Sequence, residues 1–138
     1  MKRAIALALL LSGCAGSSSY VALDRMQSAC ANGASHGEIT LSGQVVRVLG
    51  ARRSRSGEHE GFVFRTPSCS PERRPCPPSD VKVEVNEDIT GPMQVAEGDA
   101  VTVRGQYECN DGVVHWTHRD PRGRHVDGFV DVNGVRYQ

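Results

Sequence analysis

The sequence predicts an all-β domain: a small antiparallel OB-like β-barrel preceded by a short helix. Three observations favour this fold class. From Gly37 onward, short runs of β-branched and apolar residues alternate with polar ones, turn signals separate the runs, and no amphipathic helical pattern interrupts them. Five or six short strands with frequent turns are typical of a small barrel. An SH3-like barrel and a small sandwich are the alternatives.

The first residues have the features of an export signal. Lys2 and Arg3 precede a short apolar run, Ala4–Leu11. This run is too short to span a hydrocarbon core of about 30 Å as a helix. We therefore expect residues 1–13 to be a signal peptide and not a membrane-spanning segment.

The signal ends in Leu11-Ser12-Gly13-Cys14, which resembles the lipobox of bacterial lipoproteins. The resemblance implies cleavage before Cys14 and acylation of that cysteine. Several acyl chains, at about 0.8 kcal/mol per buried methylene, form a stable membrane anchor. Ala15 follows the cysteine in place of an aspartate, which points to the outer membrane of a bacterial cell envelope, with the domain facing the periplasm. An ordinary secretory signal with an incidental cysteine is the alternative.

The mature chain divides into a linking segment and one domain. Residues 14–36 are expected to hold the lipidated cysteine, a flexible tether over Gly16–Ser19 and a short helix over Val21–Ala31, ended by Asn32-Gly33. The barrel domain then spans residues 37–138. Without the signal, 125 residues remain, which is enough for one domain.

The strands are predicted in order along the barrel domain. Gly43 interrupts the first, long run at a place where a small barrel needs a sharp bend. An Asn-Asp-Gly sequence at 110–112 and Asn133-Gly134 are hairpin turn signals. The expected strands are Glu38–Gly50, Gly61–Thr66, Val81–Val85, Asp99–Glu108, Gly112–His118, Gly128–Val132 and Val135–Tyr137.

The charge balance argues against nucleic acid as a partner. Without Lys2 and Arg3, the mature chain carries 14 basic and 16 acidic residues, a net charge of −2, whereas nucleic-acid-binding domains are usually strongly basic. Phe62 and Phe64 could form a stacking platform on an oligonucleotide-binding face. Their alternation with Val63 and Arg65 instead favours packing in the barrel core.

Four cysteines besides Cys14 form an even set in an oxidising compartment. Cys69 and Cys76 bracket a short proline-rich loop, so we favour a Cys69–Cys76 disulfide and a second one, Cys30–Cys109, that pins the N-terminal segment to the domain. A zinc site made of these cysteines is the alternative, but no Cys-x-x-Cys pair supports it.

The stretch from His115 to His125 (HWTHRDPRGRH) holds three of the five histidines and the one tryptophan. Asp120-Pro121-Arg122-Gly123 has the residue preferences of a type I turn. If that turn closes a regular hairpin, His118 lies opposite His125 and Trp116 opposite Asp127. Trp116, His118, His125 and Asp127 then share one face, while His115 points to the other.

Three interpretations of this stretch follow. His118, His125 and Asp127, with Asp120 or His59 as a further ligand, have suitable side chains for zinc or manganese. A small anionic ligand, phosphate or carboxylate, could instead bind the three arginines together with a histidine. The third interpretation is structural, with these side chains bonded to the backbone and to carboxylates. The arginines are Arg119, Arg122 and Arg124.

The C-terminal part of the chain, Gly112–Gln138, resembles the signature of a small bacterial envelope family known as domain of unknown function 3465. Its members carry a His-Trp-Thr-His-x-Asp-Pro-x-Gly-x-His run, followed by a short Asn/Asp-Gly hairpin. The stretch Gly57–Phe64 resembles the family's Gly-x-Arg-His-Gln-x-Phe strand, although Glu58 replaces the arginine. Phe129 also stands where tryptophan is usual, and the connection over Thr66–Asp80 is longer than in the family.

The resemblance implies a barrel similar to the OB fold but brings no established activity. It also implies that the histidine positions and their aspartate form one site, to which we add the tryptophan of the run. The expected site residues are His59, His115, Trp116, His118, Asp120 and His125.

The sequence therefore predicts a lipid-anchored binding or interaction module more than an enzyme, with the stretch rich in histidine and arginine as its contact surface for a small anionic ligand or an envelope protein. A metal-dependent hydrolase, phosphodiesterase-like, that uses the histidine run is one alternative. Another is an inhibitor or assembly factor that presents the Cys69–Cys76 loop, with Arg73 and Arg74 as anchors.

Overall fold

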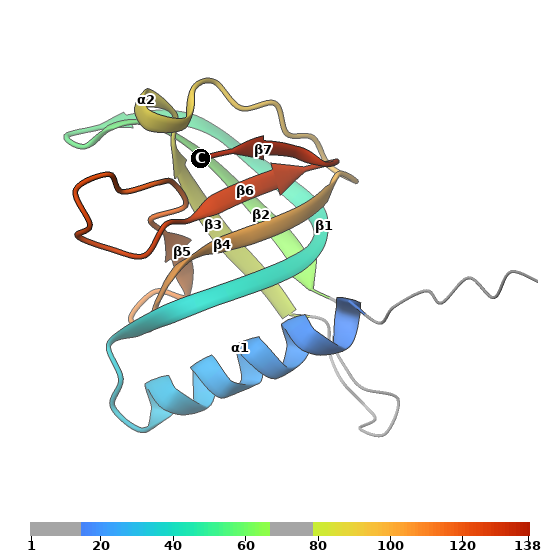
Figure 1. Cartoon of the computed structure of the whole chain (residues 1–138). Coiled ribbons are helices and arrows are strands. Elements are labelled where there is room, and N and C mark those ends of the chain that lie inside the picture. Colours follow the sequence, from blue (N-terminus) through green and yellow to red (C-terminus); the bar gives the residue numbers. More distant parts are fainter. Residues whose placement is uncertain (1–14, 67–78) are drawn as a thin grey trace, which may run out of the picture.

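The computed structural model of the chain describes residues 15–66 and 79–138 (Figure 1). Within them lie two helices and seven strands, so the predicted all-β domain with a preceding helix is confirmed. A single helical turn, α2, was not expected. The elements are α1 (Ala15–Ala31), β1 (His36–Ser54), β2 (Gly57–Thr66), β3 (Ser79–Asn86), α2 (Glu87–Thr90), β4 (Ala100–Glu108), β5 (Val113–His115), β6 (Phe129–Val132) and β7 (Val135–Tyr137).

Five of the strands close a ring. β1 pairs with β2 along its second half and with β4 along its first half, and the ring continues from β2 through β3 and β5 to β4. The pairing of β3 with β5 is parallel, and the other pairings are antiparallel. β6 and β7 form a hairpin on β4. The closed ring is the barrel that the strand pattern predicted.

The bend in β1 lies where the strand changes partners. Gln44 pairs with Arg65 of β2 and also with Ala100 of β4. A Cβ atom on the preceding residue, Gly43, would lie 2.2 Å from the carbonyl oxygen of Arg65, so only glycine fits at this crossing. The predicted bend is confirmed, and the strand continues past it to Ser54.

The core fills the interior of the ring. Valines from β1, β3, β4 and β6 surround Phe62 and Phe64 of β2, and both rings are fully buried. Burying each such ring stabilises the fold by roughly 1.5–3 kcal/mol. The two phenylalanines are therefore core residues, as predicted, and not an exposed stacking platform.

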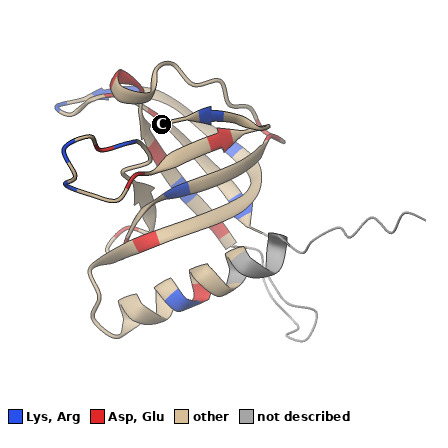
Figure 2. Cartoon of the chain, in the orientation of Figure 1, with Lys and Arg blue, Asp and Glu red and all other residues tan. Residues whose placement is uncertain are grey.

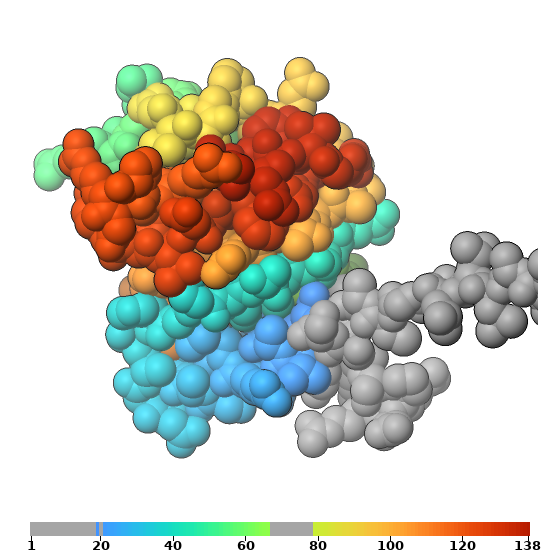
Figure 3. Space-filling view, viewed as in Figure 1, coloured from blue at the N-terminus to red at the C-terminus, as the bar shows by residue number. Residues whose placement is uncertain are grey.

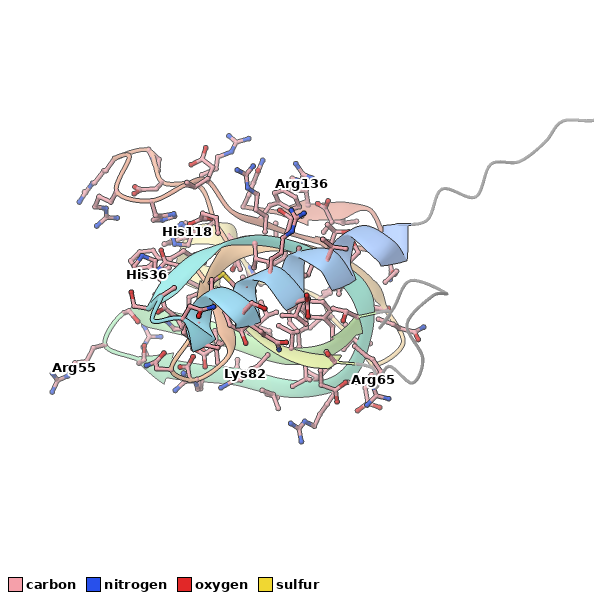
Figure 4. The ribbon with its side chains drawn as sticks, turned by 90° about the horizontal axis from the view of Figure 1, so that it is seen from below. His36, Arg55, Arg65, Lys82, His118 and Arg136 are labelled. Atoms are coloured by element: carbon pink, nitrogen blue, oxygen red, sulfur yellow. A yellow bond between two sulfur atoms is a disulfide. The ribbon has the colours of Figure 1, made fainter. Side chains whose placement is uncertain are left out.

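Helix α1 crosses the lower end of the barrel, as the view from below shows (Figure 4). It begins at Ala15, so the prediction of a flexible tether over Gly16–Ser19 is wrong. Ser19 is buried, and its hydroxyl oxygen accepts a hydrogen bond of 2.8 Å from the backbone N–H of Ser42 in β1, which holds this first part of the helix against the barrel. Among the described residues, no helix is both long enough and apolar enough to cross a lipid bilayer.

The other end of α1 is fixed in two ways. Gly33, with φ of 97°, donates its N–H to the carbonyl of Cys30, and Ala34 donates to that of Ala29. These two bonds form a Schellman cap at Asn32-Gly33, where the helix was expected to end. The predicted disulfide Cys30–Cys109 joins this end to the loop after β4. Cys14 and the Cys69–Cys76 loop lie outside the described residues.

Candidate functional site

A pocket of about 390 Å³ lies beside β5, at the end of the barrel where α1 ends. Four of the six predicted site residues line it: His59, His115, Trp116 and His118. Asp120 and His125 do not line it. The remaining lining residues are Ser56, Glu84, Asn86, Glu108, Asn110, Asp111 and Thr117.

The chain between β5 and β6 is a loop and not the predicted hairpin ladder. β5 ends at His115, and Trp116 adopts a positive φ of 57°, which breaks the strand. The loop is closed by the N–H of Gly128, which donates to the carbonyl of His118 over 2.8 Å. The predicted register, with His118 paired to His125 and Trp116 to Asp127, is therefore wrong. The left-handed turn at Trp116 also lets His115 and His118 line the same pocket.

Asp120 organises this loop. Its carboxylate, 1 % exposed, accepts hydrogen bonds from the backbone N–H groups of Arg122, Arg124 and His125. The N–H of Gly123 donates to the Asp120 carbonyl over 2.9 Å, which confirms the predicted turn. Burial raises the pKa of Asp120, but the three backbone donors and the nearby Arg124 outweigh it, so the pKa lies below its ordinary value.

Three aromatic rings of this segment contact one another in tilted and edge-to-face arrangements. The imidazole of His125 lies 4.7 Å from the Trp116 ring and 4.8 Å from the His118 ring, measured between centroids. The Nδ1 atoms of His118 and His125 each contact the carbonyl oxygen of the following residue, at 2.7 Å and 2.8 Å. Because a carbonyl oxygen only accepts, Nδ1 of each ring is the donor in this contact, which leaves Nε2 as the acceptor of the neutral tautomer.

Glu84 of β3 forms part of the pocket wall. Its carboxylate lies 2.6 Å from Arg52, 3.0 Å from Lys82 and 3.8 Å from Nδ1 of His115. Burial raises the pKa of Glu84, but hydrogen bonds from Lys82 and Arg52 outweigh it and hold the pKa below its ordinary value. The Glu84 carbonyl also accepts from the Thr117 hydroxyl over 3.2 Å, which ties the loop to β3.

Two glycines let the backbone of the histidine run approach the barrel closely. A Cβ atom at Gly105 of β4 would lie 2.3 Å from the carbonyl oxygen of His115. At Gly128 it would lie 2.2 Å from that of Trp116. Sequence reasoning missed both positions, although a glycine inside the alternating run of β4 is a signal for a close backbone contact.

The three arginines of the loop do not converge on one point. Arg119 donates to the side-chain oxygen of Gln138 over 2.6 Å once that amide is oriented with its oxygen toward the guanidinium. Arg124 lies 3.5 Å from the Asp120 carboxylate, and Arg122 is exposed. Two of the three arginines thus have partners inside the protein, and an anion site at Arg119, Arg122 and Arg124 stays a prediction.

The predicted metal ligands are not arranged around one point, and Nε2 of His125 has no hydrogen-bond partner among the described residues. Oδ1 of Asp127 accepts the backbone N–H of Asp120 over 2.8 Å. Nε2 of His125 is buried and lies 3.8 Å from the Asp120 carboxylate. Across residues 15–66 and 79–138, no three side chains of histidine, cysteine, aspartate or glutamate are arranged so that they could hold a metal ion.

Charged residues of both signs gather at this end of the molecule. The charged side chains in the pocket wall are carboxylates, those of Glu84, Glu108 and Asp111. The basic side chains cluster on the two neighbouring segments, the β1–β2 turn and the loop between β5 and β6 (Figure 2). Glu84 is already paired with Arg52 and Lys82, so Glu108 and Asp111 are the two carboxylates of the pocket wall that have no ion pair among the described residues.

The comparisons with known proteins identify the chain by family. A family model described as "Protein of unknown function (DUF3465)" matches residues 8–138. The match covers the barrel, helix α1 and every residue of the pocket wall. No curated protein matches the sequence. The protein with this barrel and this histidine pocket thus belongs to the DUF3465 family.

Proposed function

We propose that the protein is a lipid-anchored binding module of the bacterial cell envelope, and that the pocket beside Trp116 binds a neutral saccharide. The observation that carries this proposal is the setting of Trp116. This side chain is 41 % exposed at a pocket whose other residues are almost all polar. An exposed indole held by a positive φ and by the His125 ring is a preordered flat surface for a ligand.

The polar wall supports a saccharide over the small anion expected from the arginines. Hydroxyl groups of a sugar both donate and accept hydrogen bonds, and its C–H face packs on an indole. The carboxylates of Glu108 and Asp111 accept from hydroxyls, and Nε2 of His118 does so as well. An anion would meet unfavourable charge from the same carboxylates.

The fold is consistent with an anchor at Cys14. Helix α1 begins at the next residue and has 17 residues, so it is about 25 Å long. Its far end is joined through Cys30–Cys109 to residues 108–111, three of which line the pocket. Figure 1 shows β5, and Figure 4 shows His118, on the side of the barrel away from the start of α1. An anchored protein would thus hold its pocket away from the membrane surface.

Fluorescence tests the binding proposal, because Trp116 is the single tryptophan of the chain. The mature lipoprotein, purified in a polyoxyethylene detergent that has no sugar headgroup, is titrated with neutral oligosaccharides and with phosphate. A saturable change of the Trp116 fluorescence with an oligosaccharide, which is lost in the His118→Ala variant, supports the proposal. Saturable change with phosphate alone would move the site to the arginines. Fatty-acid labelling of the wild type and its absence in Cys14→Ser test the anchor.

A further inference from the structure

A second hollow, of about 570 Å³, lies at the upper end of the barrel. The segment 91–99, which follows α2, and the β6–β7 hairpin form its sides, and Figure 3 shows these two segments next to each other on the surface. Its lining combines polar residues with apolar side chains, which include Val48, Met93, Val95 and Val132. It shares no residue with the pocket beside Trp116.

One carboxyl group faces this hollow from inside the barrel. Glu60 follows the same alternation on β2 as the core residues Phe62 and Phe64, and it is only 9 % exposed. Its Oε1 atom is buried and has no hydrogen-bond partner among the described residues. A buried carboxylate oxygen without a donor costs free energy, so a ligand that supplies the donor gains that free energy on binding.

Among the described residues, no positive charge lies near enough to Glu60 to offset its own. The part of the chain that the structure describes contributes no lysine, arginine or histidine to the lining of the hollow. Burial first, and then repulsion from Glu87, raise the pKa of Glu60 by more than a backbone hydrogen bond from Gly50 lowers it, so the pKa lies above its ordinary value. The other lining carboxylate, Asp99, is already engaged, because its oxygens accept from the Ala96 N–H at 2.8 Å and from Asn133 at 2.9 Å.

We propose that this hollow binds a primary ammonium group carried on a short aliphatic chain, with Glu60 as its counter-ion. The ammonium donates to Oε1 and supplies the missing positive charge, while the aliphatic chain packs against Val48, Met93 and Val132. A neutral apolar ligand would leave the carboxylate unpaired. An anion would be repelled by Glu60 and Glu87.

Calorimetric titration of the mature lipoprotein, in a polyoxyethylene detergent, tests the proposal with n-butylamine, 1-butanol and butyrate. Butylamine should bind saturably and raise the melting temperature, while the alcohol and the acid should not. Glu60→Gln keeps the size of the side chain and should weaken butylamine binding at least about tenfold, which is the expected effect of losing a buried charge pair. Glu97→Gln is the matched control, since Glu97 is exposed on the same segment and does not line the hollow.

Two results would overturn the proposal. One is the absence of saturable heat with butylamine on a folded wild-type protein, and the other is equal binding by Glu60→Gln and wild type. If butylamine binds, the ammonium group could belong either to a lysine side chain of an envelope peptide or to a free amine. Titration with an amide of Nα-acetyl-lysine distinguishes the two. Tighter binding than butylamine indicates the lysine side chain, and equal or weaker binding indicates the free amine. His118→Ala should leave amine binding unchanged, so this proposal and the saccharide proposal fail independently.

Discussion

The imidazole ring of His118 meets that of His125 edge to face, with centroids 4.8 Å apart and ring planes at 87°. The two residues come together because Asp120 folds the loop between them, not because they face each other across a strand pair. His125 in turn supports the indole of Trp116 from behind. The pocket wall therefore depends on a residue that does not line the pocket.

Replacing His125 by alanine should lower the free energy of unfolding by about 1–2 kcal/mol, because two aromatic contacts and a buried ring are lost. His125→Phe keeps a ring of similar shape and should lose less than half as much. Urea denaturation followed by circular dichroism measures both variants against the wild type. Equal losses in the two variants would show that the ring contacts are not what His125 contributes.

Gly105→Ala should displace the histidine run, because the new methyl group would lie 2.3 Å from the carbonyl oxygen of His115. Such overpacking costs typically about 1–3 kcal/mol. Gly61→Ala is the matched control on β2, since its methyl group would meet Leu49 at 3.4 Å and should change the stability by less than about 1 kcal/mol. Thermal denaturation compares the two. A stable Gly105→Ala variant with an unchanged tryptophan spectrum would contradict the close backbone contact.

The fold could be predicted from the sequence because its signals are local. Alternating valines identify the strands of a barrel whose interior they fill, and Asn133-Gly134 identifies the last hairpin, where both residues have positive φ as the turn requires. The start of α1 could not be predicted in this way. The Gly-Ser composition of residues 16–19 is typical of a linker, and only the contact of Ser19 with β1 shows why the segment is helical.

The site could be predicted only in part. The family resemblance predicted one site for four histidines, of which His59, His115 and His118 line one pocket and His125 does not. Strand alternation instead placed His115 and His118 on opposite faces. Strand alternation does not apply from Trp116 onward, because β5 ends at His115 and Trp116 has a positive φ. Glu84 was missed for a related reason. It alternates with core valines on β3 and so faces outward, yet it is only 7 % exposed because the loop containing Thr117 packs over that outer face. The alternation of residues along a strand does not reveal a loop that packs on the outer face of the barrel.

Removing the Cys30–Cys109 disulfide should lower the free energy of unfolding by about 4 kcal/mol, since it closes a chain segment of 79 residues. The double variant Cys30→Ala/Cys109→Ala avoids leaving a free thiol. Guanidinium denaturation under oxidising conditions gives the difference from the wild type. A loss below 1 kcal/mol would mean that packing of Leu23 and Met26 under the barrel already fixes the helix in the absence of the covalent link.

The raised pKa of Glu60 should be visible in the pH dependence of the protein's stability. Its folded-state pKa is raised by burial and by Glu87, so the folded protein holds this proton more tightly than the unfolded chain does. Stability is therefore lost as the pH rises from the unfolded value, about 4.3, through the raised folded value, and it stays lower above that. Glu60→Gln is neutral at every pH and should be more stable than the wild type at pH 8.

That advantage of Glu60→Gln should shrink toward zero at pH 4, where the wild-type carboxyl is itself protonated. Carboxylates with lowered pKa values, such as Asp120 and Asp131, stabilise the fold less at acid pH. This loss is the same in both proteins, so it cancels in the difference between their stabilities. Melting temperatures from pH 4 to pH 8 give the comparison, with Glu97→Gln as the control for a change in net charge. A Glu60→Gln variant less stable than the wild type at pH 8 would mean that the carboxylate already has a stabilising partner. Glu60 would then not be an unpaired counter-ion for an ammonium ligand in the upper hollow.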